Sequence, residues 1–177
     1  MASKVQRINR WYYKVRRDNG DLCYVDLSTL RGTCEDAFYR DRSCKHVRLV
    51  LKDIGGISFR IRREYFDAFE RGEKEWELRR DTVRMTRVWN QFRETGKPGY
   101  AAIFSGRRVQ RRWVEDVAYA THAQAILQRE LSEQGKKDVG EGPVIGFKLG
   151  ERFGVGPVEQ LQDRLQADLA NKLREIA

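Results

Sequence analysis

The spacing of apolar and polar positions predicts a chain that mixes strands and helices. Residues 11–15 and 22–27 are rich in aromatic and β-branched side chains and flank a turn at 18–21, a pattern typical of a β-hairpin. Residues 43–51 follow as a helix. The later pattern predicts strands at 57–61, 74–79, 100–104, 109–119 and 144–149, and helices at 62–71, from 82, at 121–134 and at 157–177.

Two glycine-containing breaks divide this series of elements. Paired glycines at 55–56 and the Gly-Val-Gly-Pro run at 154–157 interrupt the pattern. We therefore expect a first segment at 1–55, a domain at 56–155 and a C-terminal amphipathic helix at 156–177. The middle part has about five strands and two or three helices, which suits a small β-barrel with flanking helices. The fold class is α+β.

The segment 72–79 interleaves charged and apolar residues. Gly72 stands where a helix can end in the left-handed conformation. If residues 74–79 are extended, alternation gives two sets of side chains: Glu75, Glu77 and Arg79 on one side, and Lys74, Trp76 and Leu78 on the other. Two interpretations follow. The segment is a solvated edge strand with paired charges, or it is the floor of a pocket where Lys74, Glu77 and Arg79 neutralise one another and meet a ligand.

A family resemblance favours the pocket. The pattern Gly-x-Lys-x-x-Glu-x-Arg, matched by Gly72, Lys74, Glu77 and Arg79, resembles the signature of ASCH domains, which belong to the PUA-like β-barrel superfamily. The strand and helix before it also resemble that family's opening, and the resemblance covers about residues 56–150. It implies a small barrel with a cleft beside the motif, generally linked to RNA. Some relatives are hydrolases: one branch deacetylates N4-acetylcytidine, and a ribonuclease activity has been ascribed to another.

Two hypotheses for function follow from this resemblance. In the first, the chain is a nucleic-acid-binding module, with RNA favoured over DNA. Its cleft receives an unstacked or modified nucleotide, contacted by Lys74, Trp76, Glu77 and Arg79. In the second, a hydrolase, either a ribonuclease or an N4-acetylcytidine amidohydrolase, uses Lys74 and Glu77 as catalytic residues. The acetylcytidine branch has a threonine three residues after its lysine, where this chain has Glu77. That mechanism does not transfer intact, so we favour binding.

The distribution of charge agrees with a polyanionic partner. The net charge is +9 and the isoelectric point is about 9.7. Residues 1–55 hold 12 basic and 7 acidic side chains, and residues 56–155 hold 20 and 15, so both parts are basic. A basic turn adds a candidate contact with the phosphate backbone, through Arg107, Arg108, Arg111 and Arg112. The competing interpretation of this hairpin is a solvated tip.

The first segment contains all three cysteines of the chain and one of its two histidines. Such a cluster in a cytosolic protein argues for metal rather than disulfides. Three thiolates and one imidazole would complete a tetrahedral zinc site, here Cys23, Cys34, Cys44 and His46. Buried small apolar cysteines and a surface histidine are the alternative.

The same segment resembles a SWIM zinc finger, whose pattern is Cys-x-Cys, a spacer, then Cys-x-His. Cys44 and His46 carry the likeness, so we expect a small ββα zinc-finger-like segment. One ligand departs from the pattern, because the neighbour of Cys34 is either Gly32 or Asp36. Cys23 or Asp36 can complete the site, and we prefer Cys23 because thiolate is the commoner structural ligand. The resemblance implies a recognition accessory, not a catalyst.

Two further expectations concern location and assembly. No apolar run approaches the length of a membrane span, and residues 1–10 are polar and basic, unlike a signal peptide. We therefore expect no membrane partner and a cytoplasmic location. The helix at 157–177 carries an apolar stripe that needs a partner. This partner is the barrel, the zinc segment or a second copy of the chain in a homodimer.

Overall fold

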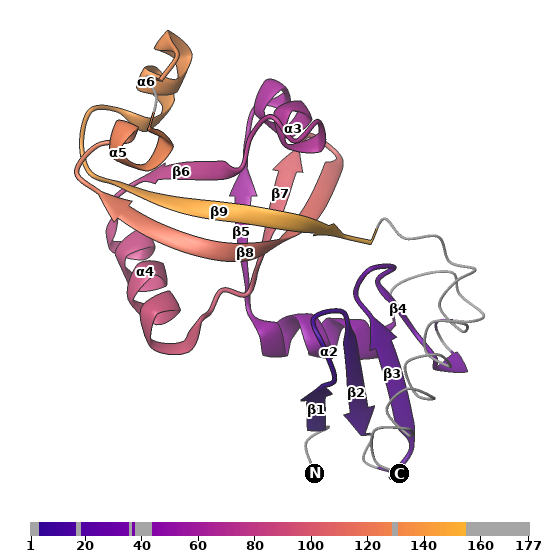
Figure 1. Ribbon diagram of the computed structural model, residues 1–177. Coiled ribbons are helices and arrows are strands. Elements are labelled where there is room, and N and C mark those ends of the chain that lie inside the picture. The colour runs from indigo at the N-terminus through magenta and orange to yellow at the C-terminus, as the bar shows by residue number, and fades with distance from the viewer. Residues whose placement is uncertain (1–3, 17–18, 36, 38–43, 129–130, 155–177) are drawn as a thin grey trace. The chain divides into compact units, whose positions relative to one another are not determined.

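The computed structural model describes residues 4–16, 19–35, 37, 44–128 and 131–154. These residues form an α+β fold that divides into two compact units (Figure 1). Unit 1 holds the described residues up to Asp53 together with Phe153 and Gly154, and unit 2 is Ile54–Arg152.

Unit 1 is built on a four-stranded antiparallel sheet in the order β1-β2-β3-β4. Its elements are β1 (Lys4–Arg7), β2 (Tyr12–Arg16), β3 (Leu22–Asp26), β4 (Arg31–Gly32) and α2 (Lys45–Ile54). The hairpin predicted at 11–27 is present as β2 and β3. The predicted ββα arrangement did not include β1 and β4. These two short polar strands lie at the edges of the sheet.

The two faces of this sheet differ in burial. Val15, Cys23 and Val25 share one face and are fully buried, as are Val47 and Val50 of α2. His46 of α2 has a ring nitrogen within 4.8 Å of the Cys23 thiol, so the helix packs on that face. The opposite face carries the even-numbered residues of the strands.

Unit 2 is a curled five-stranded sheet, a half-barrel in the order β5-β7-β8-β9-β6 (Figure 1). β5 pairs with β7 in parallel, whereas β7 with β8 and β6 with β9 are antiparallel. The strands are β5 (Gly56–Arg60), β6 (Trp76–Arg80), β7 (Tyr100–Ser105), β8 (Arg108–Ala120) and β9 (Val144–Phe153), and the helices are α3 (Arg63–Glu70), α4 (Val83–Thr95), α5 (Gln124–Leu127) and α6 (Glu133–Val139). Five strands with flanking helices agree with the coarse prediction of a small barrel-like domain.

Local sequence explains where the helices on either side of the motif begin and end. Gly72 follows α3 with a φ of 73°, a conformation that glycine adopts without strain. Thr82 caps α4 by accepting a hydrogen bond from the Met85 amide, and Gly96 ends that helix in the left-handed region. The aromatic side chains of α3 and the sheet then form one core, made of Ile57, Phe59, Phe66, Phe69, Met85, Ala101, Ile103, Val117, Ile145, Phe147 and Leu149.

Some expectations are corrected, and others fall outside the described residues. The single helix predicted at 121–134 is wrong. α5 ends at Leu127 and is followed by Gln128 with a φ of 54°, and α6 is a separate helix capped by Ser132. The helix predicted at 157–177, with its dimer hypothesis, lies outside the described residues, as does Asp36. No helix among the described residues has the length and apolar character that a membrane span requires.

Candidate functional site: a charged trio beside a cleft, and a cysteine–histidine cluster

The motif residues Lys74, Glu77 and Arg79 form one ion-paired trio. The Lys74 ammonium lies 2.7 Å from one carboxylate oxygen of Glu77, and an Arg79 nitrogen lies 2.8 Å from the other. The Glu77 side chain is only 6% exposed, whereas Lys74 is 21% and Arg79 31% exposed. The carboxylate is therefore the buried centre of the trio, and the two cations reach from it toward solvent.

The position of Lys74 differs from the one that strand alternation predicts. β6 begins at Trp76, so Lys74 lies in the bend between α3 and the strand. Its backbone amide bonds to the Ala68 carbonyl, near the end of α3. Alternation does not apply outside the strand, and Lys74 is free to turn toward Glu77.

Aromatic rings support both cations of the trio. The Lys74 ammonium lies 4.5 Å from the ring centre of Tyr65 and 4.9 Å from that of Phe69. The Arg79 guanidinium lies 4.9 Å from the ring centre of Phe59. These cation–π contacts hold the charged ends in fixed places.

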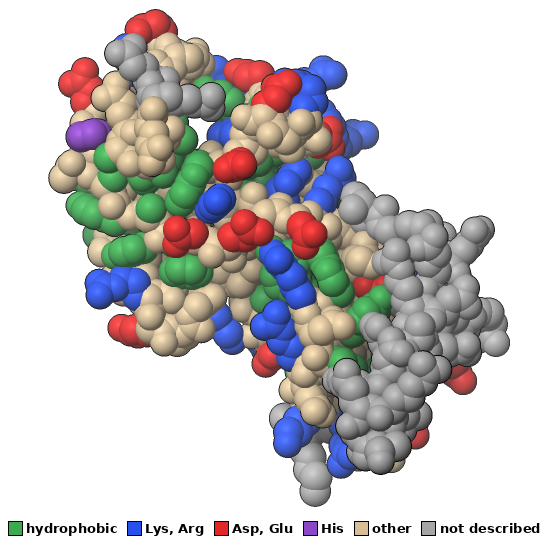
Figure 2. Space-filling view, viewed as in Figure 1, with side chains coloured by type: hydrophobic (Ala, Val, Ile, Leu, Met, Phe, Trp, Pro, Cys, Tyr) green, Lys and Arg blue, Asp and Glu red, His purple; other side chains and the backbone are tan. Residues whose placement is uncertain are grey.

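The trio lines a large cleft in unit 2, with a volume of about 1870 Å³. Tyr65, Trp76 and Phe104 contribute aromatic surface, and Ile126, Leu127 and Leu131 contribute aliphatic surface. Six basic side chains also line the cleft, namely Arg60, Arg62, Lys74, Arg79, Arg80 and Arg84, against four acidic ones, Glu73, Glu75, Glu77 and Asp138. Figure 2 shows the surface hollowed between α3 and α6.

The two ends of the sheet meet at this cleft. β5 and β6 are the edge strands of the half-barrel, and residues of both line the cleft. Arg79 of β6 donates a hydrogen bond of 2.9 Å to the Arg60 carbonyl of β5. Its Nε is buried and has no hydrogen-bond partner among the described residues. Arg79 is thus the link between the two edges, and it retains hydrogen-bonding capacity.

A second polar contact joins α3 to α6 across the cleft wall. Asp138 accepts hydrogen bonds of 3.0 Å from Arg62 and from the Tyr65 hydroxyl. Burial, together with the hydrogen bond to Asp138, raises the pKa of Tyr65 to about 12. Arg80 donates to the Val139 and Lys137 carbonyls at the end of α6. Neither Tyr65 nor Asp138 could be predicted as a site residue, because their contact joins positions 73 residues apart and leaves no local pattern.

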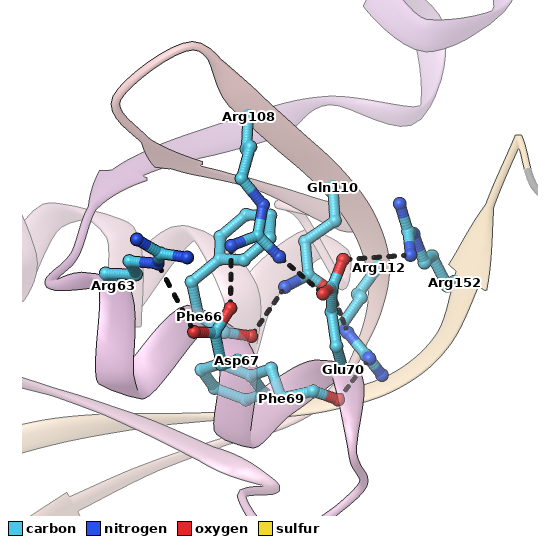
Figure 3. A network of polar contacts seen from close by, with 9 residues as sticks. All are labelled: Arg63, Phe66, Asp67, Phe69, Glu70, Arg108, Gln110, Arg112 and Arg152. Carbon is cyan, nitrogen blue, oxygen red and sulfur yellow. Dashed lines mark hydrogen bonds and ion pairs between the residues drawn. The ribbon is translucent and has the colours of Figure 1, made fainter.

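The four arginines of the β7–β8 hairpin do not share one environment. Figure 3 shows two of them, Arg108 and Arg112, beside α3. Arg108 pairs with Asp67 at 2.6 Å and with Glu70 at 2.5 Å, both on α3. Arg112 donates to the Phe69 and Gly150 carbonyls, at 2.6 and 2.9 Å. Both guanidinium groups bond to α3 and so fasten this helix to the sheet, although the Arg108 side chain is 43% exposed.

The other two arginines of the hairpin are differently placed. Arg107 is exposed and Arg111 half-buried, and neither side chain forms a hydrogen bond or ion pair with the described residues. Arg111 is opposite Ala102 of β7, and Arg112 is opposite Ala101, so the two neighbours point to opposite faces of the sheet. Only Arg107 and Arg111 therefore offer uncommitted charge to a partner.

In unit 1, Cys23, Cys34 and His46 come together as a group that could hold a metal ion. One ligand atom from each lies within 4.8 Å of the others, and all three residues are buried. The predicted fourth ligand, Cys44, is not part of the set whose ligand atoms all lie within 4.8 Å of one another. It is a direct neighbour of that set, since its thiol interacts with the side chains of the other three. Hydrogen bonding with Cys23 lowers the pKa of Cys44 to about 4 against the effect of burial, and the Val47 backbone, His46 and Cys34 lower it further. A thiolate is the form in which cysteine binds metal.

Two features of the cluster agree with a ligand between these side chains. The Nδ1 atom of His46 is buried and has no hydrogen-bond partner among the described residues. Gly32 leaves room at the same place, because a Cβ there would lie 3.0 Å from the Cys44 sulfur and 3.3 Å from the Cys23 sulfur. Thiolate and imidazole groups are the ligands that zinc prefers in structural sites.

The chain was compared with models of protein families, with curated proteins and with solved structures, and none of them matches it. The trio, the cleft and the cysteine–histidine cluster are thus the features from which a function must be argued.

Proposed function

We propose that the protein is a nucleic-acid-binding module, with RNA as its partner, and that unit 2 is an ASCH-type member of the PUA-like barrels. The observation that carries this proposal is the trio of Lys74, Glu77 and Arg79 lining a cleft of about 1870 Å³. These residues occupy three of the four fixed positions of the motif. Gly72, at the fourth, ends the helix that precedes them.

An unstacked nucleotide matches the chemistry of this cleft. A base has flat apolar faces and a polar edge, and proteins bind unstacked bases by stacking and edge hydrogen bonds. Tyr65 and Trp76 supply ring surface, and Arg79 lines the same cleft with a side chain that is 31% exposed. Arg60 and Arg84 line the same cleft and form no side-chain hydrogen bond or ion pair with the described residues, so they are available to phosphate.

Binding fits the trio better than hydrolysis does. A general base must have a lone pair within reach of the proton that it removes. Both carboxylate oxygens of Glu77 are already paired, one with Lys74 and one with Arg79. The Lys74 ammonium is likewise committed to a carboxylate and two ring faces. The hydrolase, whether ribonuclease or N4-acetylcytidine amidohydrolase, therefore remains the alternative.

One experiment separates the two functions. Purified protein is titrated into labelled single-stranded RNA, and the same RNA and N4-acetylcytidine are analysed for products. We expect salt-sensitive binding without turnover, weakened about tenfold in Lys74→Ala. The matched control is Arg71→Ala, because Arg71 pairs with Glu73 but does not line the cleft. Turnover that Lys74→Ala abolishes would establish the hydrolase instead, and equal affinity in both variants would refute the cleft as the binding site.

We also propose that the cluster in unit 1 is a structural zinc site with Cys23, Cys34, Cys44 and His46 as ligands, related to SWIM fingers. The donor set and the orphaned Nδ1 of His46 support zinc. Elemental analysis of protein purified without chelator should find close to one zinc per chain. A Cys44→Ser variant should lose it, and full zinc content in that variant would exclude the assignment.

A further inference from the structure

The sheet of unit 1 has one face that α2 does not cover. Its strand residues are Lys4, Gln6, Tyr12, Lys14, Arg16, Leu22, Tyr24 and Asp26, which the register places on the same side. Lys4 and Arg16 are exposed and Leu22 is 42% exposed, so the face is open to solvent at this end.

Positive charge is concentrated on this face, although side chains of opposite charge are the ones that stabilise paired strands. Lys4 of β1 lies directly opposite Arg16 of β2, and like charges opposite each other destabilise a sheet. Lys14 is two positions from Arg16 on the same strand, about 7 Å away. None of these three side chains has a hydrogen-bond or ion-pair partner in the described part of the chain.

The acids nearby do not neutralise this charge. Asp26 is the only acidic residue among the strand positions of this face of β1, β2 and β3. It is 1% exposed, and its carboxylate accepts a hydrogen bond of 2.7 Å from the Ser28 amide. The carboxylate therefore stabilises a turn, and the three cations remain without a counter-charge from the sheet.

Aromatic side chains lie beside the cations. Tyr24 is the cross-strand partner of Lys14, and it is half-buried. It packs with Ile8, Trp11 and Tyr12 in one apolar cluster, which holds its ring in place. A fixed ring next to unpaired cations is the combination that binds single strands, since each base has a face that can stack and each phosphate attracts a cation.

We propose that this basic sheet face, defined as Lys4, Lys14, Arg16 and Tyr24, binds single-stranded nucleic acid. The cations contact successive phosphates, and a base stacks on Tyr24. The face belongs to unit 1 and shares no residue with the cleft of unit 2, so it is a second contact surface. It does not depend on the function proposed for the cleft, although both would serve the same kind of partner.

The test measures the affinity of the full-length protein for a labelled oligouridine at increasing salt. Lys14→Ala/Arg16→Ala should bind at least tenfold more weakly, and the slope of log K against log salt should fall by about 1.4 for two lost phosphate contacts. The matched control is Arg48→Ala/Lys52→Ala, which removes two exposed cations from α2 in the same unit. Removing Arg16 also relieves its repulsion with Lys4, so the variant should fold, as thermal unfolding will verify.

A second pair of variants tests the ring independently of charge. Tyr24→Leu should weaken binding about fivefold or more, whereas Tyr24→Phe should retain it, because only the ring is needed for stacking. Equal losses in the β2 and α2 double variants would overturn the proposal in favour of general charge attraction. If Tyr24→Leu binds normally, or if polyglutamate competes as well as an unlabelled oligouridine does, the face binds polyanions in general and the proposal of a single-stranded partner is wrong. If only Lys74→Ala weakens the binding of oligouridine, the cleft is the binding site and the proposal for this face is refuted.

Discussion

Glu77 is the residue on which the geometry of the cleft depends. It is the one nearly buried charge of the trio, and each of its oxygens holds a cation from a different segment. Lys74 comes from the bend after α3, and Arg79 links β6 to β5. A single carboxylate thus holds together three segments of unit 2, so its contribution to stability should exceed that of a surface ion pair.

Replacing Glu77 by glutamine should therefore destabilise unit 2. The amide keeps the shape of the side chain but leaves Lys74 and Arg79 without a counter-charge. Removing one partner of a buried pair costs about 3–5 kcal/mol, and we expect about 2 kcal/mol because both cations are partly exposed. Urea unfolding measures the change. Glu73→Gln is the control, since Glu73 pairs with Arg71 at the surface, and an equal loss there would contradict this role of Glu77.

The pKa of Tyr65 tests whether the contact between α3 and α6 exists in solution. Its pKa is raised to about 12 by burial and by the hydrogen bond to Asp138. Asp138→Ala removes the second cause, so the pKa should fall toward the ordinary value of 10.0 without reaching it, because burial remains. NMR titration of ring-labelled tyrosine measures this value. An unchanged pKa would mean that the contact between α3 and α6 does not persist in solution.

At the scale of elements, α3 is the part of unit 2 that positions the cleft. It carries Tyr65, leads into Lys74, and is fastened to the sheet by the network drawn in Figure 3. Gln110 is 1% exposed and donates to the Phe66 carbonyl, while Arg112 donates to the Phe69 carbonyl and to Gln110 itself. Arg112, which the sequence pattern assigns to a nucleic-acid surface, instead donates to a carbonyl at the end of a helix.

Arg112→Ala should loosen α3 and thereby weaken the cleft. The variant loses three hydrogen bonds from a half-buried guanidinium, worth about 2–3 kcal/mol in the free energy of unfolding. RNA binding should weaken as well, because Lys74 and Tyr65 depend on this helix. Arg111→Ala is the matched control on the opposite face of β8. It should leave stability unchanged, and destabilisation by both variants alike would count against a specific role of the network.

For the whole molecule, the sequence predicted what depends on near neighbours. Gly72, Thr82 and Gly20 act through local backbone preferences, so two helix ends and the hairpin of β2 and β3 could be predicted. β1 and β4 could not, since short polar strands form only because a sheet edge is available to them. The contact of Arg112 with Phe69 spans 43 residues and leaves no local pattern. Lys74 was assigned to the wrong side because strand alternation was extended beyond the strand.

The two units should respond differently to loss of metal, and this difference tests the zinc proposal at the scale of the molecule. The described residues of unit 1 form a small sheet and the helix α2, and domains of that size rarely bury enough apolar surface to be stable without a metal or another cross-link. Its cysteine–histidine cluster connects β3 with α2 through Cys23 and His46. A strong chelator should therefore abolish the protection of β2 and β3 amides from hydrogen exchange, while β7 and β8 amides in unit 2 remain protected. His122→Ala is the control, because this exposed histidine belongs to unit 2 and should leave the response to chelator unchanged. Protection of β2 and β3 that persists in chelator would show that the apolar core of unit 1 is sufficient by itself, and that the four side chains are only neighbours within it.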